Sequence, residues 1–246
     1  MSGHSKWSTI KHKKGAADAK RGNLFTKLIK EITMSAKVGG GIIDSNPRLR
    51  SAVLAAKRAS MPSDNIDRAI KRGTGELEGV TYEEVVYEGY GPGGAAILVE
   101  AMTDNKNRTT AEIRHLLTKY GGNMAAAGAV AFQFSKKGYL AIEKNAAKED
   151  ALMELALESG AEDFKTDDTD VFEIITDPAS FEAVKAAVEA KKIAVHTAEI
   201  QMIPQNTIEV ADKSPALVKL LEMVEENEDV QKVWSNGDID DKYLTE

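Results

Sequence analysis

The chain of 246 residues contains no cysteine, and this absence excludes disulfide bonds, thiol catalysis and cysteine-ligated zinc or iron–sulfur sites. It also has no apolar run that approaches the roughly 20 residues of a membrane-spanning helix. The N-terminus lacks the apolar core of a secretory signal. We therefore expect a cytoplasmic protein that has no membrane partner.

The familiar signatures of catalysis are missing as well. The sequence has no H-E-x-x-H pair, no G-x-S-x-G and no Walker loop, and its four histidines do not stand at metal-ligand spacing. The acidic run 167–170 lacks the glycine and the final glutamate of a calcium loop, so it predicts a solvated turn. No set of residues supplies a nucleophile, a base and an oxyanion site. We expect no enzymatic activity, no metal, no cofactor and no small-molecule substrate.

Charge is present in quantity and is distributed unevenly. The net charge is −7, which alone argues against a nucleic-acid partner. Residues 1–75, however, contain 16 basic and five acidic residues, a net charge of +11, whereas residues 76–246 have a net charge of −18. Such asymmetry indicates a basic head that meets polyanions and an acidic body that does not. The alternative is a basic tail that is merely solvated.

The basic head reads as an extended arm followed by three helices. Residues 2–17, the arm, show no apolar periodicity, whereas 18–37 place apolar side chains on one side and lysines on the other. Three glycines at 39–41 end this helix. A second helix begins near Asn46-Pro47, and a third runs from near Pro62 to Gly73. The pattern predicts a small basic helical bundle.

The acidic body alternates short strands and helices. With 42% hydrophobic and 29% charged residues, the chain has an ordinary globular composition, and its length allows one to three domains. Units this short fit two small α+β layers of the split β-α-β, ferredoxin-like type better than one large parallel sheet. The predicted strands are 82–90, 95–102, 130–134, 139–143, 171–176, 194–203, 207–210 and 230–234, and the predicted helices are 109–120, 148–159, 178–191 and 215–227.

A glycine-rich segment, 89–94 (GYGPGG), matches G-x-G-x-x-G literally. A dinucleotide site of this type needs a following helix, but the next residues read as a strand. We interpret the segment as a connection between two antiparallel strands. Contact of its amides with a phosphate or an RNA stays as an alternative.

A second polar corner lies at 104–109 (DNKNRT), between a predicted strand and a predicted helix. A turn with an N-cap is the plain interpretation, since Asn and Thr favour both. Lys106 and Arg108 oppose the dipole at a helix N-terminus, which also suggests an anion-binding corner. The candidate anion or RNA contacts of the two segments are Tyr90, Gly91, Gly93, Gly94, Asn105, Asn107 and Arg108.

Several motifs together resemble the YebC/PmpR family over nearly the whole chain. They are 2–7 (SGHSKW), 18–22 (DAKRG), 39–41 (GGG), 46–50 (NPRLR), 65–73 (NIDRAIKRG), 87–94 (YEGYGPGG), 104–109 (DNKNRT), 135–138 (SKKG) and 236–237 (NG). The family includes the mitochondrial translational activator of cytochrome c oxidase. Most members of the family are described as probable transcriptional regulators that bind DNA, and other members look like ribosome-associated translation factors. No enzymatic activity is accepted for the family.

The resemblance implies a multidomain α+β fold with three domains. The first is a basic N-terminal arm and three-helix domain at 1–78. The second is a split α/β domain made of 79–134 and 206–246, and the third, 135–205, is inserted into the second.

These patterns lead to one functional hypothesis, a nucleic-acid-binding regulator whose basic head contacts phosphates while its acidic body stays outside. No recognition helix is apparent, so duplex DNA in general or structured RNA is favoured over sequence-specific readout. An acidic body that lies against basic ribosomal proteins would instead fit a translation factor. An enzyme with a site near Tyr90, Asn107 and Arg108, or a protein-binding adaptor, are further alternatives. The predicted nucleic-acid contacts are Lys6, Trp7, Lys11, Lys13, Lys14, Lys20, Arg21, Lys27, Lys30, Arg48 and Arg50.

Overall fold

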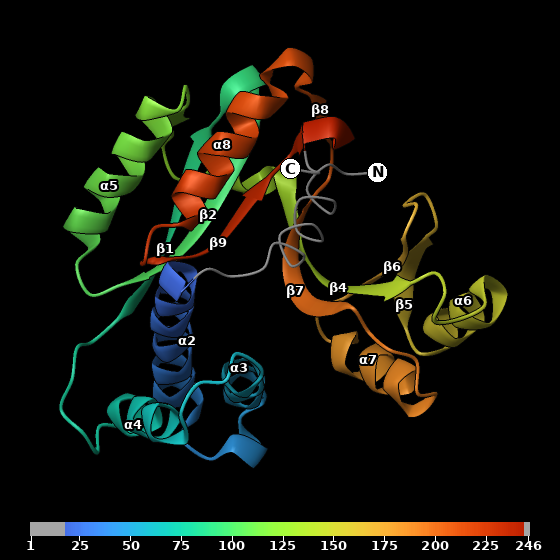
Figure 1. Ribbon diagram of the computed structural model, residues 1–246, viewed down its shortest axis with the longest axis horizontal. Coiled ribbons are helices and arrows are strands. Elements are labelled where there is room, and N and C mark those ends of the chain that lie inside the picture. The colour runs from blue at the N-terminus through green and yellow to red at the C-terminus, as the bar shows by residue number, and fades with distance from the viewer. Residues whose placement is uncertain (1–17, 244–246) are drawn as a thin grey trace.

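The computed structural model describes residues 18–243, with side chains described from residue 22 onward apart from that of residue 241 (Figure 1). Its elements form one helical group and two antiparallel four-stranded sheets, each sheet with its own pair of helices. The expected mixed α/β fold is thereby confirmed. The prediction of two split β-α-β domains is wrong for the first sheet, whose elements follow one another as strand-strand-helix-strand-helix-strand. Within the described part of the chain, no helix has the length and apolar character needed to cross a bilayer.

The helical group contains α2 (Asp18–Gly39), α3 (Pro47–Arg58) and α4 (Ser63–Thr74). Asn46 caps α3 by accepting a hydrogen bond from the Leu49 amide at 3.1 Å, and Pro47 takes the first helical position. Gly75 ends α4 with φ of 82°. The three helices pack around a core that includes Ile32, Leu49, Val53, Ile66 and Ala69. The predicted basic helical bundle thus has its three helices, at nearly the predicted bounds.

The first sheet has the order β3-β1-β2-β9 and is antiparallel throughout. Helices α5 and α8 cover one of its faces (Figure 1), where the central strand β2 contributes Ile97 and Val99 to a core shared with Ile113 and Leu217. The strands are β1 (Glu83–Tyr90), β2 (Ala96–Thr103), β3 (Asn123–Met124) and β9 (Val230–Ser235), and the helices are α5 (Lys106–Lys119) and α8 (Ser214–Glu225). A short parallel pair, β8 (Ile208–Glu209) and β10 (Gly237–Asp238), lies beyond the sheet.

The second sheet has the order β5-β6-β4-β7, and its chain order, strand-helix-strand-strand-helix-strand, is that of the split β-α-β motif. Two helices on one face bury a core that includes Leu140, Leu152, Ile174 and Val184. The strands are β4 (Phe134–Glu143), β5 (Ala161–Lys165), β6 (Val171–Thr176) and β7 (Thr197–Pro204), and the helices are α6 (Glu149–Glu158) and α7 (Phe181–Ala190).

The two sheets are connected by the long strands β4 and β7, which pair from Phe134 opposite Pro204 to Ala141 opposite Thr197. The chain leaves the first sheet after β3, builds the second, and returns through α8 to add β9 beside β2. The first sheet therefore combines two separate segments of the chain, which accords with an inserted domain. The residue boundaries given for the domains stay predictions.

The predicted strand 130–134 is wrong over most of its length. Residues Ala131–Gln133 form a 3-10 turn, and β4 begins only at Phe134. The reason is a buried carboxylate, because Glu88 accepts hydrogen bonds from the amides of Gly128, Val130 and Ala131 at 2.6, 2.7 and 2.8 Å. Those amides are consequently unavailable to a strand ladder. Strand β5 is absent from the prediction, since its Glu162 and Asp163 belong to types that strands disfavour.

Candidate nucleic-acid interface

The arm residues Lys6, Trp7, Lys11, Lys13 and Lys14 lie outside the described residues. The same holds for the side chains of Lys20 and Arg21, although their backbone belongs to α2. Their predicted contacts with nucleic acid stay predictions. The other candidates are described, and the structure separates them into groups with different roles.

The lysine side of α2 faces the C-terminal end of α8. Lys27 donates to the carbonyl oxygen of Glu225, and the Asn23 side-chain amide donates to the carbonyl oxygen of Glu226 at 2.6 Å. Both carbonyls belong to the end of α8, where unpaired carbonyls carry partial negative charge and attract donors and cations. The helical group is therefore attached to the first sheet's domain through the side that was predicted to contact phosphates.

Lys30 completes this attachment and is buried, with 6% of its surface exposed. Its ammonium donates to the carbonyl oxygen of Glu228 at 2.9 Å and to the carboxylate of Asp229 at 2.5 Å. The structure disfavours Lys30 as a phosphate contact, because its ammonium is buried and paired with Asp229. Lys27 is likewise engaged with the protein's own backbone.

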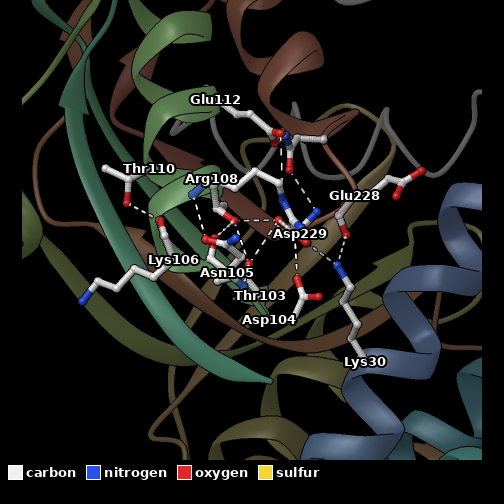
Figure 2. Close-up of polar contacts among 12 residues, drawn as sticks. Lys30, Thr103, Asp104, Asn105, Lys106, Arg108, Thr110, Glu112, Glu228 and Asp229 are labelled. Carbon is white, nitrogen blue, oxygen red and sulfur yellow. Dashed lines mark hydrogen bonds and ion pairs between the residues drawn. The ribbon is translucent and has the colours of Figure 1, made fainter. Parts of the chain in front are cut away.

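Asp229 is the centre of the polar cluster that Figure 2 shows. Its second carboxylate oxygen accepts hydrogen bonds from Arg108 at 2.8 Å, Thr109 at 2.6 Å and Thr103 at 3.2 Å. Burial alone would raise the pKa of Asp229, but the hydrogen bonds from Arg108, Lys30 and Thr109 lower it to about 2. The carboxylate is therefore a fixed negative charge at neutral pH.

The polar corner 104–109 contacts an anionic group, the carboxylate of the protein's own Asp229. Asn105 caps α5 by accepting from the Arg108 amide at 3.1 Å, which confirms the predicted turn and N-cap. The Arg108 guanidinium contacts Asp104 and Asp229, each at 2.8 Å, and these two hydrogen bonds raise its pKa. Asn107 is exposed. Since a carboxylate already occupies the corner, the structure disfavours Asn105 and Arg108 as contacts for an external phosphate.

The glycine-rich segment connects β1 to β2, which are antiparallel, and this confirms the strand-connection interpretation over a dinucleotide site. Gly93 and Gly94 have φ of 77° and 79°, a conformation that glycine adopts easily. The Gly91 amide donates to Ala95 at 2.7 Å and the Gly94 amide to Gly91 at 3.0 Å. Tyr90 donates its hydroxyl to the carbonyl oxygen of Ala129 at 3.2 Å. Two of the glycine amides that could cradle a phosphate are thus used inside the turn.

Arg48 and Arg50, both on α3, differ in their surroundings. Arg48 makes a two-point hydrogen-bonded pair with Glu31 at 2.8 and 3.0 Å and also contacts Glu84 at 2.5 Å. The hydrogen bond to Glu31 is the main cause that raises the pKa of Arg48. Arg48 therefore connects α3 to α2 and β1. Among the described residues, the one hydrogen-bond acceptor of the Arg50 side chain is the backbone carbonyl of Asp44, at 3.1 Å.

Besides Arg48, six cations of α3 and α4 are exposed, and all but Arg50 are absent from the contacts predicted from the sequence. Among the residues whose side chains the structure describes, no carboxylate forms an ion pair with them, and several lie in the last helical turn, where the helix dipole favours a cation. The shared helical periodicity could have identified them, because they occupy positions between the buried ones. They are Arg50, Lys57, Arg58, Arg68, Lys71 and Arg72.

A cleft of about 1190 Å³ separates the helical group, the open face of the first sheet and the β7–α7 side of the second. Its lining is more acidic than basic, and burial raises the pKa of Glu100 on its floor, an effect that Lys232 and Lys136 partly offset. Such a lining disfavours a polyanion. The acidic residues are Glu31, Glu84, Glu100, Glu182, Glu199, Glu222, Glu225 and Glu226, and the basic residues are Lys27, Arg48, Arg58, Lys136, Lys185 and Lys232.

Comparison with known families finds a matching family model for the basic N-terminal part of the chain and another for the acidic part. Residues 5–76 match the TACO1/YebC protein N-terminal domain, and residues 82–237 match the TACO1/YebC second and third domain. The two matched ranges together take in most of the chain, including the helical group and both sheets.

Similar proteins span the same length. A probable transcriptional regulatory protein of Desulforapulum autotrophicum is 61% identical over 243 residues and covers 98% of each chain. One from Koribacter versatilis is 61% identical over 245 residues, with 99% of this chain and 98% of the relative covered. The crystal structure of a conserved hypothetical protein, Aq1575, from Aquifex aeolicus matches with a TM-score of 0.82 at 45% identity, over 93% of this chain and 95% of that one.

Proposed function

Because the chain belongs to the TACO1/YebC family, whose similar members are named probable transcriptional regulatory proteins, we propose that it is a non-enzymatic regulator of gene expression that binds nucleic acid. The observation that carries this proposal is electrostatic. A helical head with a net charge of +11 presents six cations of α3 and α4 that have no carboxylate partner within the described residues, while the remaining chain carries −18.

Binding then follows from release of the counterions that surround a nucleic acid. The arm lysines and the exposed cations of α3 and α4 replace condensed salt ions along the phosphate backbone. Such contacts position a protein without reading bases, so we expect affinity for duplex DNA or structured RNA with little sequence preference. If about six cations contact phosphates, affinity falls about 10³-fold between about 50 and 200 mM salt.

The test uses fluorescence anisotropy with a short labelled DNA duplex and a labelled RNA hairpin. Reversal of two adjacent cations of α3, Lys57→Glu with Arg58→Glu, should weaken binding and reduce the slope of log affinity against log salt by about 2. The matched control reverses two adjacent exposed lysines of the second sheet's domain, Lys191→Glu with Lys192→Glu, and should leave the slope unchanged. Equal effects of the two pairs, or a slope near zero for the parent chain, would contradict the proposal.

The arm supplies a second test of the same function. Replacement of Lys11, Lys13 and Lys14 by Glu should abolish binding of both probes at the lower salt concentration, because three attractions become repulsions. A triple variant that binds as tightly as the parent would remove the arm from the interface and leave α3 and α4 as the contact surface.

A second candidate function is action on the ribosome as a translation factor. The acidic body favours it, since −18 charges over residues 76–246 repel bare duplex but suit basic ribosomal proteins. Sedimentation with ribosomes in sucrose gradients at low and high salt separates the two candidates. Cosedimentation at low salt that is lost on reversal of Lys57 and Arg58 supports the ribosomal role, whereas binding to promoter DNA alone supports the transcriptional one.

The proposed partners, DNA or ribosomes, put the chain in the cytoplasm. The predicted division into 1–78, 79–134 with 206–246, and 135–205 is part of the proposal, and it is supported by separate hydrophobic cores in the helical group and beneath each sheet. No small-molecule substrate or cofactor is needed for a function that rests on phosphate contacts.

A further inference from the structure

The cleft between the three groups of elements is too acidic for a polyanion and too apolar to be merely solvated. We propose that it is the docking site of the chain's own basic arm, residues 2–17. The occupant is thus a covalently attached cationic segment, which would lie between the helical group and the two sheets when no other partner holds it.

Charge complementarity is the first support for this proposal. The arm contains four lysines and no carboxylate, so it has a net charge of +4. The cleft lining contains eight carboxylates against six cations, and three of those carboxylates, Glu222, Glu225 and Glu226, belong to the last turn of α8 and the residue that follows it. A cationic peptide gains from this excess of negative charge.

The apolar part of the lining is the second support. Three of the large hydrophobic side chains that the fold leaves exposed line this cleft, namely Leu24, Leu54 and Val86, with 43%, 47% and 54% of their surfaces exposed. The arm interleaves its lysines with Trp7 and Ile10. A segment of this composition can pair its cations with carboxylates while it covers apolar surface.

The point of attachment is the third support. The arm joins α2 at Asp18, and Asn23 and Leu24, about one and a half turns later, line the cleft. Asn23 is held at the end of α8 by its hydrogen bond to Glu226, so the arm enters beside the most acidic part of the lining. A stretch of 16 residues reaches at most about 55 Å, and a tether of this length keeps the arm at about millimolar effective concentration near the cleft.

Docking and nucleic-acid binding would then compete for the same lysines. This competition goes beyond the proposed function, because the carboxylates of the acidic body would occupy the arm lysines in place of nucleic-acid phosphates. Docking itself can be tested in the absence of nucleic acid, and its outcome is therefore independent of whether the chain binds DNA or RNA.

Because the chain has no cysteine of its own, two introduced cysteines can form a disulfide without competition from native thiols. One cysteine is placed in the arm, Thr9→Cys, and a second in the cleft at an exposed position of β1, Val86→Cys. The matched control pairs Thr9→Cys with His115→Cys, which is exposed on α5 one turn from Glu112 and does not line the cleft. Glu112 contacts Asn227 at 2.8 Å, next to the residue that holds Asn23, so the control position is also within reach of the arm.

We expect the cleft pair to form an intrachain disulfide at least about tenfold faster than the control pair, since a tether alone would offer the thiol to both positions at similar effective concentration. The rate for the cleft pair should fall toward that of the control on replacement of Lys11, Lys13 and Lys14 by Glu. Circular dichroism verifies that each variant is folded. Equal rates for the two pairs, a rate that the lysine replacements leave unchanged, or disulfides that form only between two chains would each overturn the proposal.

Discussion

Lys30 of α2 and Asp229, which precedes β9, form a buried ion pair with 2.5 Å between ammonium nitrogen and carboxylate oxygen and with 7% and 5% of their side chains exposed. The pair joins residues 199 positions apart. Burial of two charges is costly unless other hydrogen bonds satisfy them, and here Glu228, Arg108, Thr109 and Thr103 supply those bonds. The head and the body of the chain are thus fastened by a complete polar network.

Removal of one member of this pair should be strongly destabilising. Lys30→Met leaves the carboxylate of Asp229 buried with one cation fewer, so we expect the free energy of unfolding to fall by about 3–5 kcal/mol. Urea denaturation followed by circular dichroism measures the change. The control Lys71→Met, at an exposed lysine of α4, should alter stability by less than about 0.5 kcal/mol. A similar small effect for both variants would show that the pair does not hold the head in place.

The same carboxylate gives a pH dependence with a definite sign. Its pKa is lowered from the ordinary 3.8 to about 2, so the folded protein holds the charged form more strongly than the unfolded chain does. This stability is present above pH 4 and is lost as the pH falls from about 4 to about 2. The shift corresponds to about 2 kcal/mol.

Thermal denaturation between pH 7 and pH 2.5 checks this expectation when the parent is compared with Asp229→Asn, which cannot titrate. The parent should lose about 2 kcal/mol more than the variant over the acidic part of the range. Parallel pH profiles of the two proteins would mean that Asp229 titrates as an ordinary exposed carboxylate.

Glu88 predicts a similar local effect in the loop before β4. Burial alone would raise the pKa of Glu88, but hydrogen bonds from the amides of Gly128, Val130 and Ala131 lower it. Glu88→Gln replaces one acceptor oxygen by a donor that faces these amides, so we expect a loss of about 2–3 kcal/mol. Faster hydrogen exchange at the Val130 and Ala131 amides is the specific readout. The control Glu83→Gln, exposed on β1, should leave both stability and exchange unchanged.

The sequence allows the helical group and the antiparallel connection at 89–94 to be predicted because their signals are local. Asn46-Pro47 caps a helix, and Gly40 and Gly75, both with positive φ, follow the ends of α2 and α4. The predicted stop at Gly73 is wrong by two residues, because Gly73 lies inside α4. The strand expected at 130–134 fails because a distant carboxylate, Glu88, takes its amides. Local sequence propensity cannot reveal a hydrogen-bond acceptor that lies more than 40 residues earlier in the chain.

The candidate site shows the same limit. A helical projection places Lys27 and Lys30 away from the core of the helical group, but it cannot distinguish a solvated side from one that packs on another domain. The corner at 104–109 is predicted to bind an anion, and the identity of that anion, Asp229, depends on a fold in which β9 lies beside β2. The exposed cations of α3 and α4 are visible in the sequence and become prominent only once Lys27 and Lys30 of α2 are seen to be bound by the protein itself.

Close packing at Gly138 in β4 provides a last prediction about the second sheet. A Cβ atom at this position would lie 2.2 Å from the Thr176 hydroxyl and 2.6 Å from the Phe181 ring, so Gly138→Ala must push α7 away from the sheet. We expect destabilisation of about 1–3 kcal/mol from this overpacking. The matched control is Gly22→Ala in α2, where a Cβ atom would meet nothing within 4 Å and where alanine should instead stabilise the helix by about 1 kcal/mol. Urea denaturation of both variants measures the free energy of unfolding, which should fall for Gly138→Ala and rise for Gly22→Ala. An unchanged stability of Gly138→Ala would show that β4 and α7 are less tightly packed than these distances require.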